Sequence, residues 1–178
     1  MRTIIQLISS LNEVAGKVAS VFNLLLVAVV CMDVIVRYLI KQSSAAFYEL
    51  EWHMFAFIFL ISAGWTLRHE RHVRVDIFYA KASPRVQAVI DVCGVLLLLL
   101  PFSLTLISTG LPYALVAFES GEGSPDTGGL PFRWIVKSFI VIGTGLLILQ
   151  GVAMLLEKIL FLIEGKEREG KERSEDVA

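Results

Sequence analysis

The sequence is poor in charged residues. Only 19% of its 178 residues are Asp, Glu, Lys or Arg, whereas soluble domains carry about 25%. The apolar share is 56% and the mean hydropathy is +0.71, which excludes a disordered chain and argues against a soluble globular domain. Lipid is the solvent that such a composition fits. We therefore predict an all-α integral membrane protein with one membrane domain.

The sequence also lacks the residue patterns of cofactor sites. Its two cysteines, Cys31 and Cys93, lie in apolar runs and belong to no zinc or redox motif. His53 is the only histidine in an apolar window, so no histidine pair at matched depth could ligate haem. Nucleotide-binding, hydrolase and zinc-protease motifs are absent, as is the basic excess of a nucleic-acid binder. We expect no cofactor, no metal, no nucleic-acid partner and no enzymatic activity.

Four apolar windows are long enough to cross a bilayer, which requires about 20 apolar residues. These windows predict four transmembrane helices, over residues 18–40, 47–67, 92–118 and 134–163. Pro101 and Pro112 lie inside the third window. Membrane helices tolerate proline where neighbours satisfy the freed carbonyls, so we expect kinks there and not a break.

The distribution of Lys and Arg predicts the orientation of these helices. With the N-terminus in the cytoplasm, the cytoplasmic segments carry 12 of these residues and the outer segments carry 4. The positive-inside rule therefore places both termini and the central loop in the cytoplasm.

Two terminal segments lie outside the four windows. Residues 1–17 have apolar side chains at helical spacing, with Glu13 and Lys17 largely on the opposite face. This pattern predicts an amphipathic helix on the inner leaflet. An uncleaved helix is favoured over a signal peptide, because the apolar run that follows extends to residue 40. Residues 164–178 are nearly all charged or small and predict a solvated cytoplasmic tail.

Ionisable residues inside a span are candidates for function, because each is costly in lipid unless it is paired or hydrated. Asp33 and Arg37 are four residues apart near the outer end of the first helix and are expected to form an ion pair. A contact with another subunit is the alternative. Glu49 and Glu51 open the second helix, where acids suit the positive end of the dipole. Glu49 could also pair with His53 one turn later.

Two polar loops connect the helices. The central loop over residues 68–79 is basic and leaves two interpretations open, lipid headgroup binding or docking of a cytoplasmic partner. The outer loop over residues 119–131 is rich in Gly and acid, which is typical of a mobile connector. Its acidic surface could also meet a periplasmic partner. Trp134 and the two residues before it form an interfacial anchor.

Several short motifs keep a distinctive order along the chain. They are DVIVRY (33–38), FYELEWH (47–53), AGWTLR (63–68), HVRVD (72–76), GGLPFRW (128–134) and LQG (149–151). Together they resemble, over residues 18–160, the DctQ-like small membrane subunit of tripartite ATP-independent periplasmic (TRAP) transporters. The stretch at 128–134 is most similar to the subset labelled mannitol/chloroaromatic or 2-oxoacid type.

The resemblance implies a non-catalytic scaffold in the bacterial inner membrane. A large multi-spanning permease subunit would hold the sodium and substrate sites, and a periplasmic binding protein would deliver an organic acid. Membrane lipids are the remaining expected partner. The residues implied to stabilise the subunit and its contact with the permease are Arg37, Glu49, Glu51, Trp52, Arg74 and Asp76. Asp33, through its ion pair, and Trp134, through its interfacial position, are further structural or interface candidates. Three glycines, Gly64, Gly143 and Gly145, are expected to permit close helix approach.

Two other functions fit the residues in part. A self-contained small transporter would need an ion-binding group at mid-bilayer, and the third and fourth windows offer none. An assembly subunit of an unrelated membrane complex is the second alternative. Such a protein would also lack ion-binding and catalytic residues between its helices.

Overall fold

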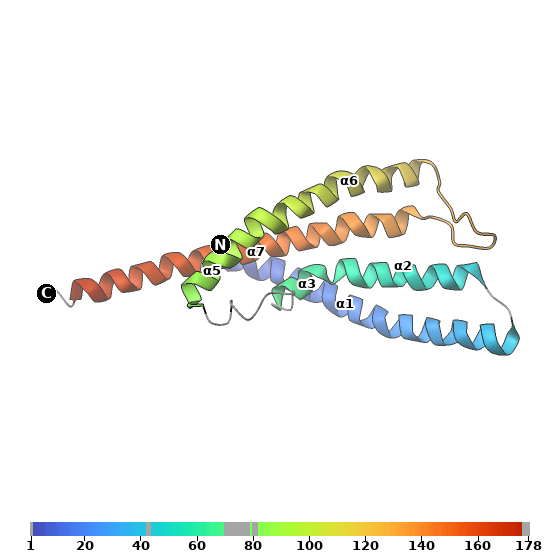
Figure 1. Ribbon diagram of the computed structural model, residues 1–178, viewed down its shortest axis with the longest axis horizontal. Coiled ribbons are helices and arrows are strands. Elements are labelled where there is room, and N and C mark those ends of the chain that lie inside the picture. The colour runs from blue at the N-terminus through green and yellow to red at the C-terminus, as the bar shows by residue number, and fades with distance from the viewer. Residues whose placement is uncertain (1, 42–43, 70–78, 80–81, 176–178) are drawn as a thin grey trace.

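The computed structural model describes residues 2–41, 44–69, 79 and 82–175, with side chains up to residue 164 (Figure 1). Within these ranges the regular structure is helical and contains no strand. The helices long and apolar enough to span a bilayer cover Arg2–Ile40, Ala45–Arg68, Pro84–Glu119 and Trp134–Glu164. The prediction of an all-α fold with four membrane helices is confirmed.

The first span is one long helix. α1 (Arg2–Ile35) continues into the π-helical turn η1 (Val36–Ile40), and the chain leaves it at Lys41 in a left-handed conformation. No helix end occurs near residue 17, so residues 2–17 are the first half of this helix and not a separate element. A position on the inner leaflet stays a prediction.

The second span bends once near its inner end. α2 (Ala45–Ile61) is followed, after Ser62, by α3 (Ala63–Arg68). The Ser62 backbone N–H still donates to the carbonyl of Ile58 at 3.1 Å, so the helical path continues through the bend. The predicted window over residues 47–67 matches the two helices together.

The third span begins earlier than its apolar window. α5 (Pro84–Gly94) starts with Pro84 at a first-turn position and with the Ser83 hydroxyl accepting from the Val86 N–H at 3.5 Å. The π-helical turn η2 (Val95–Leu99) then leads into α6 (Leu100–Glu119). Pro101 follows directly. Because proline cannot donate a backbone hydrogen bond and clashes with the preceding turn, a widened turn accommodates it.

The fourth span is the central helix of the bundle. α7 (Trp134–Glu175) packs against α6 on one side and against α1, α2 and α3 on the other (Figure 1). Its helical backbone continues through most of the segment predicted as a tail.

Glycines allow the closest helix contacts. A Cβ at Gly143 would lie 2.4 Å from the Leu60 carbonyl oxygen, and one at Gly64 would lie 3.0 Å from that of Leu146. Gly145 has open space around its Cβ position. Two residues correspond to about 200° of helix rotation, so Gly145 points away from the contact that Gly143 makes. Within the described part of the chain it permits no close helix contact.

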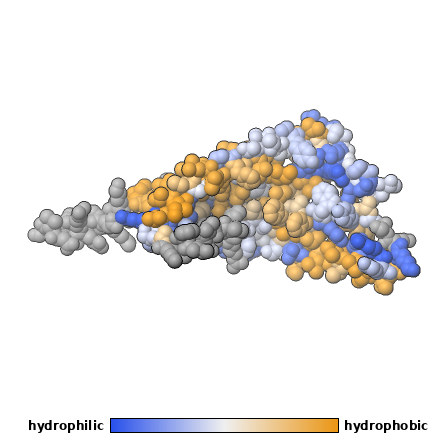
Figure 2. Space-filling view, in the orientation of Figure 1, coloured by the Kyte–Doolittle hydropathy of each residue, from blue (hydrophilic) through white to orange (hydrophobic). Residues whose placement is uncertain are grey.

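The surface matches a bundle embedded in lipid. Large apolar side chains on every span face outward, and Leu24, Phe59 and Leu98 are 72%, 67% and 72% exposed. Figure 2 shows this hydrophobic surface along the helices and hydrophilic residues near the α1–α2 and α6–α7 connections. These two connections lie at one end of the bundle, and the C-terminal part of α7 extends from the other (Figure 1). We call the first end the outer end, following the orientation predicted above.

Candidate functional site

A buried carboxylate organises the outer end. Glu49, in the first turns of α2, is 2% exposed. Its Oε1 accepts from the Ser124 hydroxyl at 2.5 Å and from Arg133 Nη2 at 3.0 Å, and its Oε2 accepts from the Leu130 backbone N–H at 2.6 Å. We name Glu49, Ser124, Leu130 and Arg133 the Glu49 cluster. It attaches the α6–α7 connection to the start of α2.

The α6–α7 connection folds tightly around this carboxylate. The Ser124 N–H donates to the Leu130 carbonyl at 3.1 Å. Gly128 has a φ of 80°, which glycine adopts readily. A Cβ at Gly129 would lie 2.2 Å from Ser124 Oγ and 2.7 Å from Glu49 Oε2. The glycines thus allow a compact turn and a close approach of the backbone to Glu49. The composition had predicted a mobile connector instead.

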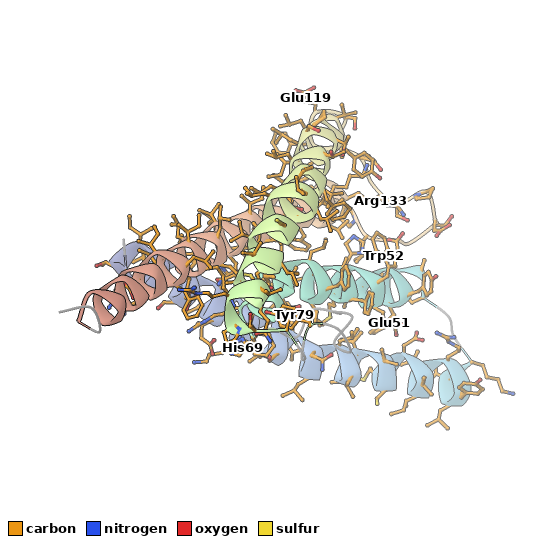
Figure 3. All side chains as sticks on the ribbon, turned by 60° about the vertical axis from the view of Figure 1, so that its left-hand side comes forward. Glu51, Trp52, His69, Tyr79, Glu119 and Arg133 are labelled. Atoms are coloured by element: carbon orange, nitrogen blue, oxygen red, sulfur yellow. The ribbon has the colours of Figure 1, made fainter. Side chains whose placement is uncertain are left out.

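Aromatic rings flank the Glu49 cluster. The Arg133 guanidinium carbon lies 5.8 Å from the centre of the Trp52 ring, within cation–π range. Figure 3 shows Trp52 on the side of α2 that faces Arg133. Trp134, the first residue of α7, meets Phe118 edge to face at 5.3 Å between ring centres. These contacts join α2, α6 and α7 at the outer end.

A second ion pair reinforces the same connection. Lys137 is 9% exposed, and its Nζ lies 2.5 Å from Glu122 Oε2 and 3.8 Å from the centre of the Tyr113 ring. The sequence predicted Arg133 only as part of an interfacial anchor and assigned no role to Lys137 or Ser124. For Lys137 a signal was present, because an ionisable residue near the start of a span needs a partner.

Asp33 and Arg37 form an ion pair with each other, as their spacing predicts. Asp33 is 3% exposed, while the Arg37 side chain is half exposed. The pair neutralises a buried carboxylate near the outer end of α1. A role toward another subunit stays a prediction.

Glu51 differs from the other acids of the outer end. Its Oε1 is buried, and within the described part of the chain it has no hydrogen-bond partner. In Figure 3 Glu51 projects from α2 on the side away from Trp52 and Arg133. The predicted Glu49–His53 carboxylate pair is wrong: the Glu49 carboxylate is taken up by its cluster, and His53 Nδ1 lies 2.5 Å from the Glu49 backbone carbonyl.

Charged groups at the inner end are paired across helices as well. Asp91 of α5 forms an ion pair with Lys158 of α7 at 2.9 Å. Glu13 of α1 accepts from Arg68 Nη1 at 3.1 Å and from Trp65 Nε1 at 3.2 Å. Neither set was predicted, because its members are distant in the sequence. The predicted docking residues Arg74 and Asp76 lie outside the described residues.

This arrangement of charges points to structural and interaction roles. Over the described residues, no group of three or more His, Cys, Asp or Glu side chains could hold a metal ion. The ion pairs cited above join one helix to another, to a connecting turn or to its own next turn. Such pairing fixes the positions of the helix ends relative to one another and to the connecting turn.

Comparison with known proteins identifies the family. Residues 26–161 match the family described as tripartite ATP-independent periplasmic transporters, DctQ component. No curated protein matches the chain closely enough to count as a relative. The family match covers most of the chain and includes both ends of the bundle. The chain therefore belongs to the DctQ family, and it is the small membrane component of a TRAP transporter and not an enzyme.

Proposed function

We propose that this subunit is the non-transporting scaffold of a sodium-coupled TRAP system that imports an organic acid across the bacterial inner membrane. It binds the large permease subunit within the bilayer. Its outer end lies beside the docking position of a periplasmic substrate-binding protein, and both of its termini are cytoplasmic. The mannitol/chloroaromatic or 2-oxoacid type is the proposed subset.

The Glu49 cluster carries this proposal. A carboxylate buried at the start of α2 accepts hydrogen bonds from a hydroxyl, a guanidinium and a backbone N–H of the α6–α7 connection. Such a charge-assisted set holds a loop in one conformation. The scaffold thus has a fixed outer surface, which suits repeated docking of a soluble partner.

The pairing of the buried charges supports a scaffold role. Asp33, Asp91 and Glu49 each have a basic partner within the chain. A transport site needs polar groups near the bilayer midplane that are available to ion and substrate. In this subunit the paired acids lie toward the ends of the spans and serve helix packing.

Glu51 Oε1, which has no hydrogen-bond partner among the described residues, marks the proposed contact with the permease subunit. A buried acceptor without a donor is unfavourable, and a Lys, Arg or hydroxyl group of a neighbouring subunit would satisfy it. Trp52 is adjacent in sequence. Trp52, on the other side of α2 from Glu51, and the half-exposed Arg37 at the outer end of α1 are the further residues proposed to stabilise this end or its contact with the permease.

We expect Glu51→Gln to weaken recovery of the permease subunit by about threefold or more, since a charge-assisted hydrogen bond across the interface would be lost. The isolated small subunit should keep its thermal midpoint, because no partner within the described chain is removed. Affinity purification in mild detergent followed by quantitative mass spectrometry measures the recovery. Glu119→Gln, an exposed acid at the end of α6, is the control. Unchanged recovery with Glu51→Gln would remove Glu51 from the interface.

Subunit exchange tests the scaffold role itself. We expect that replacing this chain by a DctQ component of another TRAP system leaves the substrate preference of any assembled transporter unchanged, because the permease and the binding protein hold the substrate. Competition assays of uptake in reconstituted vesicles measure that preference. A preference that follows the small subunit would contradict the proposal.

A further inference from the structure

A cavity of about 340 Å³ lies at the inner end of the bundle, where α1, α3 and α7 meet. Its volume is in the range of small-ligand sites. Four of its polar lining residues matter for what it could hold: Arg68, Gln150, Glu157 and Lys158. It is remote from the Glu49 cluster, which lies at the opposite end of the molecule.

Gln150 provides a buried acceptor in this cavity. The residue is 4% exposed, and its Oε1 is buried without a hydrogen-bond partner among the residues that the structure describes. An amide oxygen only accepts hydrogen bonds. A ligand that satisfies Gln150 must therefore present an N–H or O–H group.

Arg68 provides hydrogen-bond donors in the same cavity. Its Nη1 donates to the Ser9 carbonyl at 2.6 Å and to Glu13 Oε2 at 3.1 Å. A guanidinium has five N–H groups, and for Nη2 and Nε the described part of the chain offers no hydrogen bond. Arginine recognises phosphate oxygens through such forked donors.

The charged groups at and beside the cavity add up to one negative charge. Arg68 and Lys158 are each paired with an acid, Glu13 and Asp91 respectively. Glu157 lines the cavity, is exposed and adds negative charge. The cavity therefore has no excess of positive charge for a purely anionic group, and a ligand with one negative and one positive group fits it better.

The depth of the cavity matches the membrane interface. With Trp134 at the outer interface and a rise of about 1.5 Å per residue, Gln150 lies about 24 Å along α7 and Lys158 about 36 Å. The hydrocarbon core of a bilayer is about 30 Å thick. The cavity thus extends from the inner edge of the hydrocarbon to the level of the phospholipid headgroups.

We propose that this cavity binds the headgroup of a phospholipid with a phosphodiester and a primary ammonium group, as in phosphatidylethanolamine. Arg68 donates to the phosphate oxygens. The ammonium group donates to Gln150 Oε1 and is attracted to the Glu157 carboxylate. A choline headgroup has the same charges but no N–H, so it cannot satisfy Gln150. This site does not depend on the scaffold role proposed above.

Native mass spectrometry of the purified full chain tests this site. The protein is offered equal amounts of phosphatidylethanolamine and phosphatidylcholine with identical acyl chains. We expect phosphatidylethanolamine to be retained about fivefold or more over phosphatidylcholine, because only its ammonium group donates hydrogen bonds. Gln150→Leu should abolish the preference. The control Thr144→Val, a buried polar site on α7 outside the cavity lining, should keep it.

Two further arms keep the test decisive. Glu157→Gln changes an exposed residue and should lower the retention of phosphatidylethanolamine even if Gln150→Leu fails to fold, because the attraction between its carboxylate and the positive headgroup is lost. Soluble phosphoethanolamine at millimolar concentration should not displace the lipid, since acyl chains anchor the headgroup in the bilayer. Equal retention of the two lipids by the unaltered chain, or undiminished retention of phosphatidylethanolamine in Glu157→Gln, would overturn the proposal. Displacement by phosphoethanolamine would overturn the lipid as the source of the headgroup.

Discussion

Gly143→Ala is expected to destabilise the subunit strongly. The added methyl would lie 2.4 Å from the Leu60 carbonyl oxygen and 2.7 Å from its carbon. These are backbone atoms, so no side-chain rotation relieves the overlap, and α7 must move away from α2. Overpacking of this kind costs about 1–3 kcal/mol, and we expect the upper part of that range. Unfolding in detergent, followed by circular dichroism, measures the change.

Gly145→Ala is the matched control for this prediction. It introduces the same methyl group two residues later on α7, where no atom of another described helix lies within 4 Å of the new Cβ. Its stability should stay within about 1 kcal/mol of the unaltered chain or rise, because Ala favours a helix over Gly. Equal stability of Gly143→Ala and Gly145→Ala would contradict the close contact between α2 and α7.

Glu49→Gln is expected to release the α6–α7 connection. Both carboxylate oxygens of Glu49 accept hydrogen bonds, Oε1 from Ser124 and Arg133 and Oε2 from Leu130. The amide nitrogen of glutamine only donates, so in either orientation of the amide a donor faces a donor. Hydrogen exchange at the Leu130 amide should accelerate about tenfold or more, as expected for local opening. Exchange followed by mass spectrometry on peptides covering residues 120–133 measures it.

Glu119→Gln serves as the control for the release of the connection. It makes the same chemical change at an exposed acid of the outer end, and exchange at Leu130 should stay as in the unaltered chain. Exchange that is as slow in Glu49→Gln as in Glu119→Gln would contradict the role assigned to the Glu49 cluster.

The helices were predictable because lipid imposes a simple rule on composition. A span must be apolar over about 20 residues, and all four predicted windows coincide with helices. Helix ends followed a different rule. α1 and α5 continue well beyond their apolar windows, because a helix also continues through polar residues where other helices or water satisfy its side chains.

The candidate site was predictable only where its partners are close in sequence. Asp33 and Arg37 are four residues apart, and the structure contains their ion pair. The sequence singled out Glu49 as a residue of interest but did not identify its partners. Ser124, Leu130 and Arg133 are 75 to 84 residues away, and only the packing of α2 beside α7 brings them together.

The glycines illustrate the same limit. Gly143 and Gly145 are equivalent by residue type, and both lie in one apolar run. The rotation of α7 about its axis decides which of them faces α2, and that rotation depends on the packing of the whole bundle. The sequence alone therefore assigned close approach to both glycines.

Purification of the chain from its native membranes, followed by reconstitution, tests the central claim most directly. A tag on this subunit should recover a multi-spanning permease in stoichiometric amount. The recovered complex, supplied with the periplasmic binding protein, should take up an organic acid in vesicles only when a sodium gradient is present. Omission of the small subunit should abolish assembly or uptake. Recovery of the subunit alone, folded and monodisperse, or uptake by the permease without it, would contradict the scaffold role.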